Sequence, residues 1–182
     1  MNIDWALVSR AIEYYKCSGF SYLEVPWLCS KTAMSTCPND KTPILAAHPT
    51  LSLGYLAGSA EQSFMQMMLD GKLSAGKYVA ATPCFRDDDL DEFHFRHFFK
   101  VELIDFEPSH FNIYPLLHRA KCFMEQLTNK IITIEKTEIG ADLYCDGIEL
   151  GSYGYREFQN FKWIYGTGLA LPRFTQVCYR NK

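Results

Sequence analysis

Charged and aromatic residues alternate along residues 94–102, and this spacing could bind a nucleotide. If the segment is a strand, residues two apart share a face. One face then carries His94, Arg96, Phe98, Lys100 and Glu102. A flat ring flanked by cations and a carboxylate suits a purine nucleotide, with the ring against the base and the cations against the phosphates. A half-buried strand with a solvated outer face is the alternative that the pattern leaves open.

Acidic residues crowd into the segment just before this pattern, at Asp87, Asp88, Asp89, Asp91 and Glu92. The segments on either side, residues 77–87 and 94–107, both have the composition of strands. Together they predict a long antiparallel hairpin with the acidic cluster as its connection. The second face of the second strand is apolar and is expected to enter the core.

Helical spacing of apolar residues predicts three helices elsewhere in the chain. The first follows an N-cap at Asp4 and ends before Gly19. The second covers residues 60–69, and the third covers residues 112–131. Residues 28–50 are polar and irregular, which predicts a long loop.

The C-terminal part of the chain has the pattern of strands and turns. Residues 141–158 predict a hairpin whose turn is Asp146–Gly147, because that dipeptide favours a two-residue turn. Residues 161–182 predict a strand, a glycine turn at 166–168 and a short helix. This mixture indicates an α+β fold in which an antiparallel β-sheet is flanked by helices. With 182 residues and no visible linker, the chain is predicted to form a single domain over residues 1–182.

Composition excludes several classes of protein. The formal net charge is −3 and there is no run of Lys and Arg, which argues against extensive binding of DNA or RNA. The seven cysteines form no CxxC pair and predict free thiols in a reducing cytosol. The N-terminus does not have the pattern of a signal peptide, and no run of 18 apolar residues occurs. We therefore expect a cytoplasmic protein without a membrane span.

Residues 85–102 resemble motif 2 of class II aminoacyl-tRNA synthetases, with Phe-Arg and acidic residues, a variable loop, and then His-x-x-x-Phe-x-x-x-Glu. In that family the motif binds ATP. The resemblance implies that Arg86 contacts the α-phosphate and that Asp88 helps to hold the adenylate. It likewise implies that His94 reaches the γ-phosphate and that Phe98 stacks on the adenine.

Two further segments resemble the other motifs of the same family, in the same order. Residues 19–26 resemble motif 1, which builds the family's dimer interface, so a homodimer is implied. Residues 166–173 resemble motif 3. By that resemblance, Gly166 and Gly168 let ATP approach the backbone, and Arg173 covers the adenine and the γ-phosphate.

Residues 146–156 are similar to a segment of aspartyl-tRNA synthetases and, less closely, to one of seryl enzymes. The similarity implies that Glu149 binds the Mg²⁺ that bridges the ATP phosphates, and that Ser152 assists. Oxygen ligands with several retained waters suit this ion.

The amino-acid pocket is also implied by resemblance. Glu61 and Gln62 lie in a segment similar to the one that holds the substrate's α-amino group, and Glu102 would border the pocket. In an aspartyl-like alignment, Arg156 stands where an arginine recognises the substrate's side-chain carboxylate, and an arginine suits such a bidentate pair. A solvent-facing Arg156 without a role in specificity remains the alternative.

The chain also departs from the family. Met65 stands where aspartyl enzymes carry a lysine, and Trp163 stands where seryl enzymes carry a threonine, so the amino acid is left open. Asp91 and Glu92 add negative charge to the loop that approaches the tRNA end in synthetases. No segment resembles an anticodon-binding domain. A stand-alone catalytic core without measurable affinity for bulk tRNA is therefore expected.

The resemblance implies that the chain activates an amino acid with ATP and Mg²⁺, forming an aminoacyl-adenylate. Arg86 and Arg173 would be the catalytic residues, because they offset charge on the phosphates without acting as nucleophile or base. The acyl group would pass to a tRNA acceptor stem, a carrier protein or a small molecule. The alternative is a catalytically silent paralogue that binds an amino acid or nucleotide and regulates a partner. A relative of biotin or lipoate ligases is disfavoured because their glycine-rich signature is not seen.

Overall fold

The computed structural model describes residues 2–37, 45–48, 50–87, 89–107 and 111–179. Asp88, for which the resemblance implies contact with the adenylate, lies outside these residues. Residues 38–44 and 49 of the predicted loop also lie outside them.

Within the described residues, seven strands form one large sheet in the order β1-β4-β5-β9-β8-β7-β6. Only β1 and β4 are parallel, and the other neighbours are antiparallel. The strands of this sheet are β1 (Ser21–Tyr22), β4 (Lys77–Phe85), β5 (His97–Asp105), β6 (Ile132–Lys136), β7 (Gly140–Cys145), β8 (Ile148–Phe158) and β9 (Phe161–Leu171). A separate small sheet pairs β2 (Leu28–Cys29) with β3 (Tyr55–Leu56).

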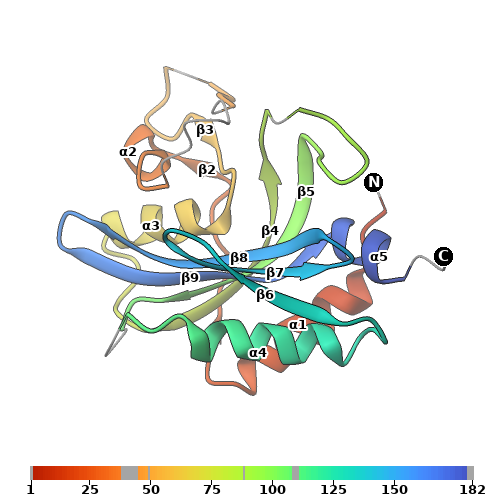
Figure 1. The fold of residues 1–182 in the computed structure, drawn as a ribbon. Helices are drawn as coiled ribbons and strands as arrows, with labels where there is room; N and C mark the ends of the chain where they lie inside the picture. The colour runs from red at the N-terminus through yellow and green to blue at the C-terminus, as the bar shows by residue number, and fades with distance from the viewer. Residues whose placement is uncertain (1, 38–44, 49, 88, 108–110, 180–182) are drawn as a thin grey trace.

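The helices in the described part of the chain are α1 (Trp5–Lys16), α2 (Lys31–Met34), α3 (Ala60–Leu69), α4 (Tyr114–Glu125) and α5 (Arg173–Cys178). In Figure 1, α1 and α4 cover one face of the large sheet, and α3 lies on the other side with the small sheet. The loop between β4 and β5 rises from the sheet on the same side as α3. The predicted α+β fold, an antiparallel sheet flanked by helices, is confirmed.

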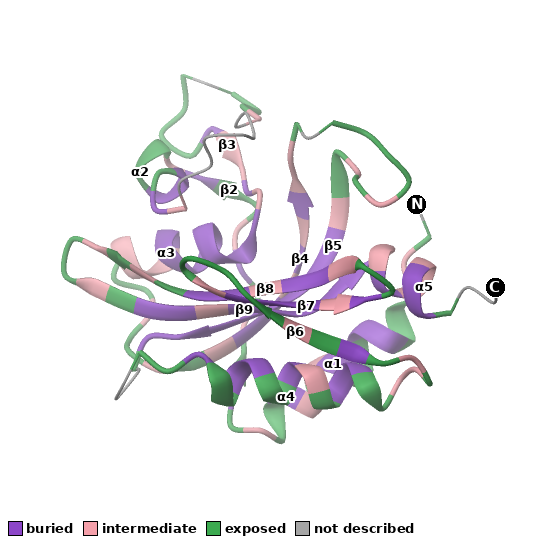
Figure 2. Ribbon diagram, viewed as in Figure 1, coloured by how far each residue is buried: buried purple, intermediate pink, exposed green. Residues whose placement is uncertain are grey.

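The main hydrophobic core lies between the large sheet and the two helices α1 and α4. Its fully buried members include Tyr15 of α1, Phe123 of α4 and Tyr153 of β8. A smaller cluster, with Phe64 and Trp163, packs α3 onto the opposite face. Figure 2 shows that the sheet is buried along its centre, where both layers cover it. One part of the second face is left for polar side chains, and the candidate site lies there.

The predicted helices are confirmed with one change of length. The helix expected at residues 60–69 is α3, with the same bounds. Asp4 caps α1 as predicted, because its Oδ1 accepts a hydrogen bond from the N–H of Leu7 at 3.0 Å. The third helix is shorter than predicted, since α4 ends at Glu125 and residues 126–131 form turns that lead to the edge strand β6.

Among the predicted turns, one is confirmed and one is wrong. Asp146 and Gly147 form the tight turn between β7 and β8, with φ of 49° and 78°. The glycine turn at residues 166–168 is wrong, because β9 runs unbroken through them. The long loop predicted for residues 28–50 is wrong in part, because β2 and α2 lie within it.

The aromatic residues of α1 are mostly used within the monomer. Tyr15 is fully buried, and the ring of Tyr14 lies 4.9 Å from that of Phe123. Trp5 is different, because 61% of its surface is exposed. Of these three rings, Trp5 is therefore the most exposed, and it meets the Phe99 ring edge-on at a centroid distance of 4.9 Å. Separately, none of the helices described in the structure combines the length and apolar character needed to cross a bilayer.

Candidate functional site

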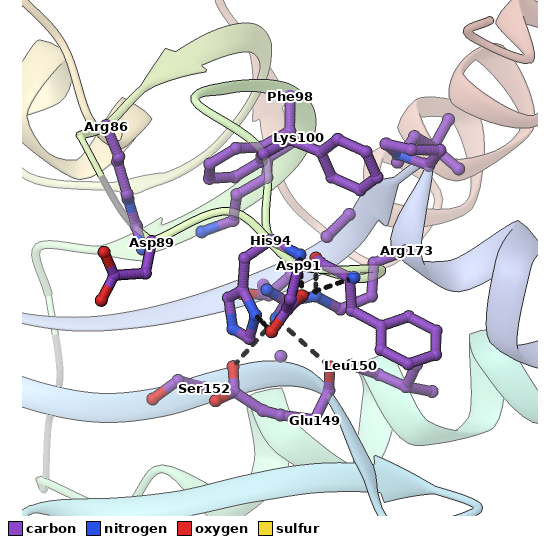
Figure 3. Close-up of a pocket in the computed structure, with 17 residues that line it drawn as sticks. Arg86, Asp89, Asp91, His94, Phe98, Lys100, Glu149, Leu150, Ser152 and Arg173 are labelled. Carbon is purple, nitrogen blue, oxygen red and sulfur yellow. Dashed lines mark hydrogen bonds and ion pairs between the residues drawn. The ribbon is translucent and has the colours of Figure 1, made fainter. Parts of the chain in front are cut away.

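A cavity of about 750 Å³ opens on the sheet face opposite α1 and α4. Its walls come from the β4–β5 loop (residues 86–96), from β5, β8 and β9, and from the start of α5. Figure 3 shows Arg86, His94, Lys100, Glu149 and Arg173 arranged around this space. We call it the nucleotide cavity, because the side chains expected to bind ATP line it: Arg86, His94, Phe98, Glu149 and Arg173.

A second cavity of about 290 Å³ adjoins the first. The side chains expected to bind the amino acid line it: Glu61, Gln62, Glu102 and Arg156. We call it the acyl cavity. Among the described residues, the ones that border both cavities are Arg86, Lys100, Glu149, Ser152 and Thr167. The structure therefore brings the two sets of predicted residues together in one continuous site.

Arg86 follows β4 and is held by the backbone next to α3. Its Nε donates a hydrogen bond to the carbonyl of Gly58 at 2.9 Å. Its guanidinium carbon lies 5.3 Å from the centre of the Phe98 ring, which is within cation–π range. Among the side-chain nitrogens of Arg86, Nε is the only one with a hydrogen bond to a described residue, so the two terminal nitrogens can face a ligand.

His94 reaches the nucleotide cavity from the loop, and the prediction that it lies on the strand is wrong. β5 begins at His97, and a turn held by Asp91 places His94 instead. Asp91 Oδ1 accepts from the N–H groups of Phe93 and His94 at 2.6 and 2.7 Å, and Oδ2 lies 2.6 Å from His94 Nδ1. These hydrogen bonds, that from Phe93 first, lower the pKa of Asp91. The site is thus assembled partly by a turn rather than by strand periodicity.

Arg96, the other cation predicted on that strand face, does not line the nucleotide cavity. Its Nε lies 3.5 Å from Asp87 Oδ1, in the exposed part of the loop. The prediction that Arg96 shares a face with the nucleotide-binding residues is therefore wrong. Its position makes it a suitable control for Arg86.

Arg173 is the first residue of α5 and connects two walls of the nucleotide cavity. Its Nε donates to the carbonyl of Phe93 in the loop at 3.2 Å. Its Nη1 donates to the carbonyl of Glu149 at 3.3 Å and lies 3.8 Å from Glu149 Oε1. The helix start, the loop and β8 are therefore fixed relative to one another.

Glu102 is a buried residue on the wall of the acyl cavity, and several donors surround its carboxylate. Its carboxylate accepts from Ser59 Oγ and Lys100 Nζ, each at 2.7 Å, and from the N–H of Ala60. Burial alone would raise the pKa of Glu102, but the charge of Lys100 and these hydrogen bonds outweigh it and lower the pKa. Glu102 is thus an ionised anchor that joins β5 to the start of α3 and holds Lys100 in place. Lys100 was predicted to lie on this strand face, but no role was predicted for it.

Glu61 and Arg156 form an ion pair on the wall of the acyl cavity. Arg156 Nε and Trp163 Nε1 both donate to Glu61 Oε1, at 2.9 and 2.6 Å. The Arg156 guanidinium lies over the ring of Tyr165, 4.5 Å from its centre. Burial alone would lower the pKa of Arg156. The charge of Glu61 and the other nearby groups outweigh burial and raise the pKa. Arg156 is therefore not a solvent-facing arginine without partners.

Gln62 holds the backbone around the acyl cavity. Its Oε1 accepts from the N–H of Gly58 at 2.7 Å, and its Nε2 donates to the carbonyl of Met34 at 3.4 Å. Both ends of the amide are thus engaged within the chain. Because Gly58 also accepts from Arg86, this amide supports the position of Arg86.

The missing side chains of Gly166 and Gly168 in β9 leave space for residues of α4 and α1, on the helix side of the sheet. A Cβ on Gly166 would lie 2.3 Å from Leu116 Cδ2 of α4, and one on Gly168 would lie 2.7 Å from the Tyr15 ring. The glycine that permits close packing on the cavity side is Gly151, whose Cβ would lie 2.6 Å from Thr167 Cβ. Neither Gly151 nor Thr167 was predicted to be a site residue.

Asp142 is a carboxylate next to Ser152 of the nucleotide cavity, and no sequence motif predicted it. It pairs with Ser152 in the β7–β8 register and is only 9% exposed. Its Oδ1 has no hydrogen-bond partner among the described residues. Burial raises the pKa of Asp142, a hydrogen bond from Ser152 opposes the rise, and the charges of Glu149 and Glu135 add to it.

These oxygens fit a magnesium ion that shares its coordination with a bound ligand. Glu149, Ser152 and Asp142 supply oxygen donors, which Mg²⁺ prefers, and Asp142 has an unpartnered oxygen to offer. No group of three or more His, Cys, Asp or Glu in the described residues could hold a metal alone. The ion would therefore depend on phosphate oxygens and water for the rest of its coordination.

Replacing Asp142 with asparagine is expected to stabilise the free protein at neutral pH by on the order of 1 kcal/mol, because it removes a buried, incompletely paired charge. A carboxylate whose pKa is raised on folding costs stability above that pKa and none below the pKa of the unfolded chain. The gain of D142N should therefore shrink as the pH falls through this range. Thermal unfolding of both proteins from pH 3 to pH 8 measures the difference.

The same D142N substitution is expected to raise the Mg²⁺ concentration needed for half-maximal ATP-linked activity, because it removes one proposed oxygen ligand. A melting temperature below that of the original protein at pH 8 would contradict the assignment of a buried, incompletely paired carboxylate. Ser152→Ala is a useful comparison, because it removes a hydrogen bond from Asp142 without changing a charge.

No protein-family model matches the sequence, and no curated protein matches it. Solved structures, in contrast, share its fold. Cytoplasmic serine-tRNA ligase from Naegleria fowleri, in complex with AMP, has a TM-score of 0.73 at 18% identity over 96% of this chain. Seryl-tRNA synthetase from Pyrococcus horikoshii, complexed with ATP, has a TM-score of 0.76 at 17% identity over 96% of the chain.

The pyrrolysyl-tRNA synthetase PylSc from Desulfitobacterium hafniense has a TM-score of 0.70 at 14% identity over 95% of the chain. The present chain spans 47%, 49% and 66% of the N. fowleri, P. horikoshii and D. hafniense chains. It therefore has the fold of the catalytic domains of class II aminoacyl-tRNA synthetases.

Proposed function

We propose that the chain activates an amino acid with ATP, forming an aminoacyl-adenylate, and then transfers the acyl group to an acceptor. The observation that carries the proposal is the shared wall of the two cavities. Arg86 and Lys100 border both, so an α-phosphate in one cavity and a carboxylate in the other would meet the same cations. The neighbours in complex with AMP and ATP support the assignment of the nucleotide.

In the proposed reaction, a carboxylate oxygen of the amino acid attacks the α-phosphorus of ATP. The bond from that phosphorus to the α,β-bridging oxygen breaks, and pyrophosphate leaves with its electron pair. No side chain needs to take a proton, because the attacking carboxylate is already ionised. Arg86 would hold the α-phosphate, and Phe98 would stack on the adenine.

His94 and Arg173 would bind the leaving phosphates from the loop and from α5. Their hydrogen bonds to Asp91 and to the Phe93 carbonyl fix them relative to one another before ATP arrives. Glu149, with Ser152 and Asp142, would hold Mg²⁺. When bound, the ion would offset negative charge on the phosphates.

In the acyl cavity, Glu61 and Arg156 are the groups with capacity for a substrate. The Glu61 carboxylate lines the acyl cavity and would bind the α-amino group, while its Oε1 accepts hydrogen bonds from Arg156 and Trp163 and the Cys37 thiol also interacts with it. The terminal nitrogens of Arg156 would face the side chain. Glu102 and Gln62 are already engaged by the chain, and we assign them the role of holding the wall.

The decisive experiment is ATP–pyrophosphate exchange, with each of the twenty amino acids tested singly and with Mg²⁺ but no tRNA. Exchange with one of them would establish activation and name the substrate. No exchange, together with ATP binding in calorimetry, would favour the silent regulatory paralogue. Absence of both would refute the proposal. Exchange in Mg²⁺-free buffer with a chelator is the control for the metal.

For the acceptor of the acyl group, the relevant feature is the negative charge of the β4–β5 loop. Asp89 and Asp91 are acidic residues of this loop, and both line the nucleotide cavity. We predict no saturable binding of bulk tRNA at physiological salt, because these charges would repel phosphates. Fluorescence anisotropy with labelled tRNA tests this. Tight binding would instead make an acceptor stem the favoured acceptor over a carrier protein or a small molecule.

We also propose a homodimer in the cytosol. Exposed apolar side chains include Tyr22 within the motif 1-like segment, Trp27 directly after it, and Trp5 at the start of α1. All seven cysteines lie within the described residues and are free thiols, which suits a reducing compartment. Sedimentation that shows a monomer at micromolar concentration would refute the dimer.

A further inference from the structure

The polypeptide of β9 departs from regular strand geometry next to the nucleotide cavity. Thr167 and Ala170 both line that cavity although they are three residues apart. In a regular strand, residues an odd number apart point to opposite faces. Between them, the Cβ position of Gly168 faces the Tyr15 ring, and Leu169 is buried in the helix-side core.

A β-bulge at Gly168 explains this change of face. On the neighbouring strand, Glu102 lies opposite Thr167 and Val101 lies opposite Leu169, which leaves Gly168 without an opposite residue. One extra residue in a strand reverses the alternation beyond it. The bulge is therefore what allows both Thr167 and Ala170 to face the cavity.

Two buried tyrosine hydroxyls hold the backbone of this bulge. Tyr15 of α1 donates a hydrogen bond to the carbonyl of Gly168 at 2.9 Å, and Tyr153 of β8 donates one to the carbonyl of Thr167. Both tyrosines are fully buried. Burial, above all other causes, raises the pKa of both hydroxyls well above the usual value, so they remain donors at physiological pH.

We infer that Tyr15 and Tyr153 are positioning residues, which fix the bulge at Gly168 from behind the sheet and so aim Thr167 and Ala170 into the nucleotide cavity. Neither tyrosine lines the cavity. The inference rests on the proposed nucleotide site for its effect on ligand binding, but the geometry of the bulge does not depend on the ligand. It also gives Gly168 a reason to be glycine, since a side chain there would displace the Tyr15 ring.

The test is Tyr15→Phe, which removes one hydroxyl and keeps the ring that packs against Gly168. Tyr14→Phe is the matched control, because the neighbouring hydroxyl lies on the same helix and donates to the Arg119 carbonyl at 3.3 Å, away from the cavity. We expect the Kd for ATP, measured by calorimetry well below the melting temperature, to rise about fivefold in Y15F and to stay unchanged in Y14F. Tyr153→Phe should act like Y15F.

A second readout does not need a ligand. In ¹H–¹⁵N spectra of the free protein, the amide signals of Thr167, Gly168 and Ala170 should shift in Y15F and stay in place in Y14F. If these signals do not move in Y15F, or if Y15F lowers only the melting temperature while ATP binding is unchanged, the inference is wrong. If the signals move but the original protein binds no ATP, the positioning of the bulge stands and the proposed function fails.

Discussion

Replacing Arg86 with alanine is expected to lower ATP–pyrophosphate exchange about a hundred- to a thousandfold, the usual effect of losing one preorganised donor at a developing charge. Arg86 borders both cavities, and its terminal nitrogens have no partner among the described residues. Its loss would therefore remove a cation at the point where the two substrates meet. Exchange rates at saturating ATP and amino acid measure the effect.

Arg96→Ala is the matched control for this substitution. Arg96 is an arginine of the same loop, but it pairs with Asp87 outside the nucleotide cavity. We expect its exchange rate to stay within about twofold of the original protein, since an exposed ion pair contributes little. Equal losses in R86A and R96A would mean that the net charge of the loop, and not the position of Arg86, supports the reaction. Arg86→Lys should remain impaired, because a lysine lacks the planar fork of donors.

Replacing Glu102 with glutamine is expected to destabilise the fold by about 3–5 kcal/mol, because it leaves the buried Lys100 without a counter-charge. Glu102 also receives hydrogen bonds from Ser59 and from the N–H of Ala60, at the start of α3. Such a loss is a large part of the roughly 5–15 kcal/mol that stabilises a typical domain. Urea unfolding followed by circular dichroism measures it.

The pH dependence of the same variant gives a second check. The pKa of Glu102 is lowered on folding, despite burial, by Lys100 and its hydrogen-bond donors. Its stabilising effect is therefore present above the pKa of the unfolded carboxyl and is lost as the pH falls through the folded value. The difference between the original protein and E102Q should shrink in acid.

A double variant separates charge from packing. Lys100→Met combined with Glu102→Gln removes both charges and is expected to recover much of the stability lost in E102Q, because no buried charge is left alone. Its exchange activity should remain low, since Lys100 borders both cavities. A double variant as unstable as E102Q would show that the hydrogen bonds to α3, and not the ion pair, make Glu102 necessary.

Local patterns predicted much of the fold. The bounds of α3, the N-cap of α1 and the Asp146–Gly147 turn depend on neighbours in sequence, and all are confirmed. The edge strand β6 was not predicted. It pairs with β7, and its Ile-Thr-Ile run is typical of a strand, so the signal was present in its own residues.

The positions of the candidate site residues agree with the sequence where they depend on strand alternation, and they differ where they depend on a turn or on register. Phe98, Lys100 and Glu102 follow strand alternation, whereas His94 is placed by the carboxylate of Asp91 in a turn. Asp142 comes next to Ser152 only through the pairing of β7 with β8. The Asp146–Gly147 turn alone would place Asp142 opposite Gly151, and a register shift between β7 and β8 places it opposite Ser152 instead. The bulge in β9 is likewise visible only against β5.

The wall shared by the two cavities affects how tightly the product of the proposed reaction would be bound. A ligand that fills both cavities binds as one molecule, so its second half binds at the effective concentration set by the covalent link to the first. Its overall translational and rotational freedom is lost once rather than twice. An aminoacyl-adenylate is such a ligand. The chain would therefore hold its own product far more tightly than either substrate, and would act as a store of activated acyl groups that empties when an acceptor arrives.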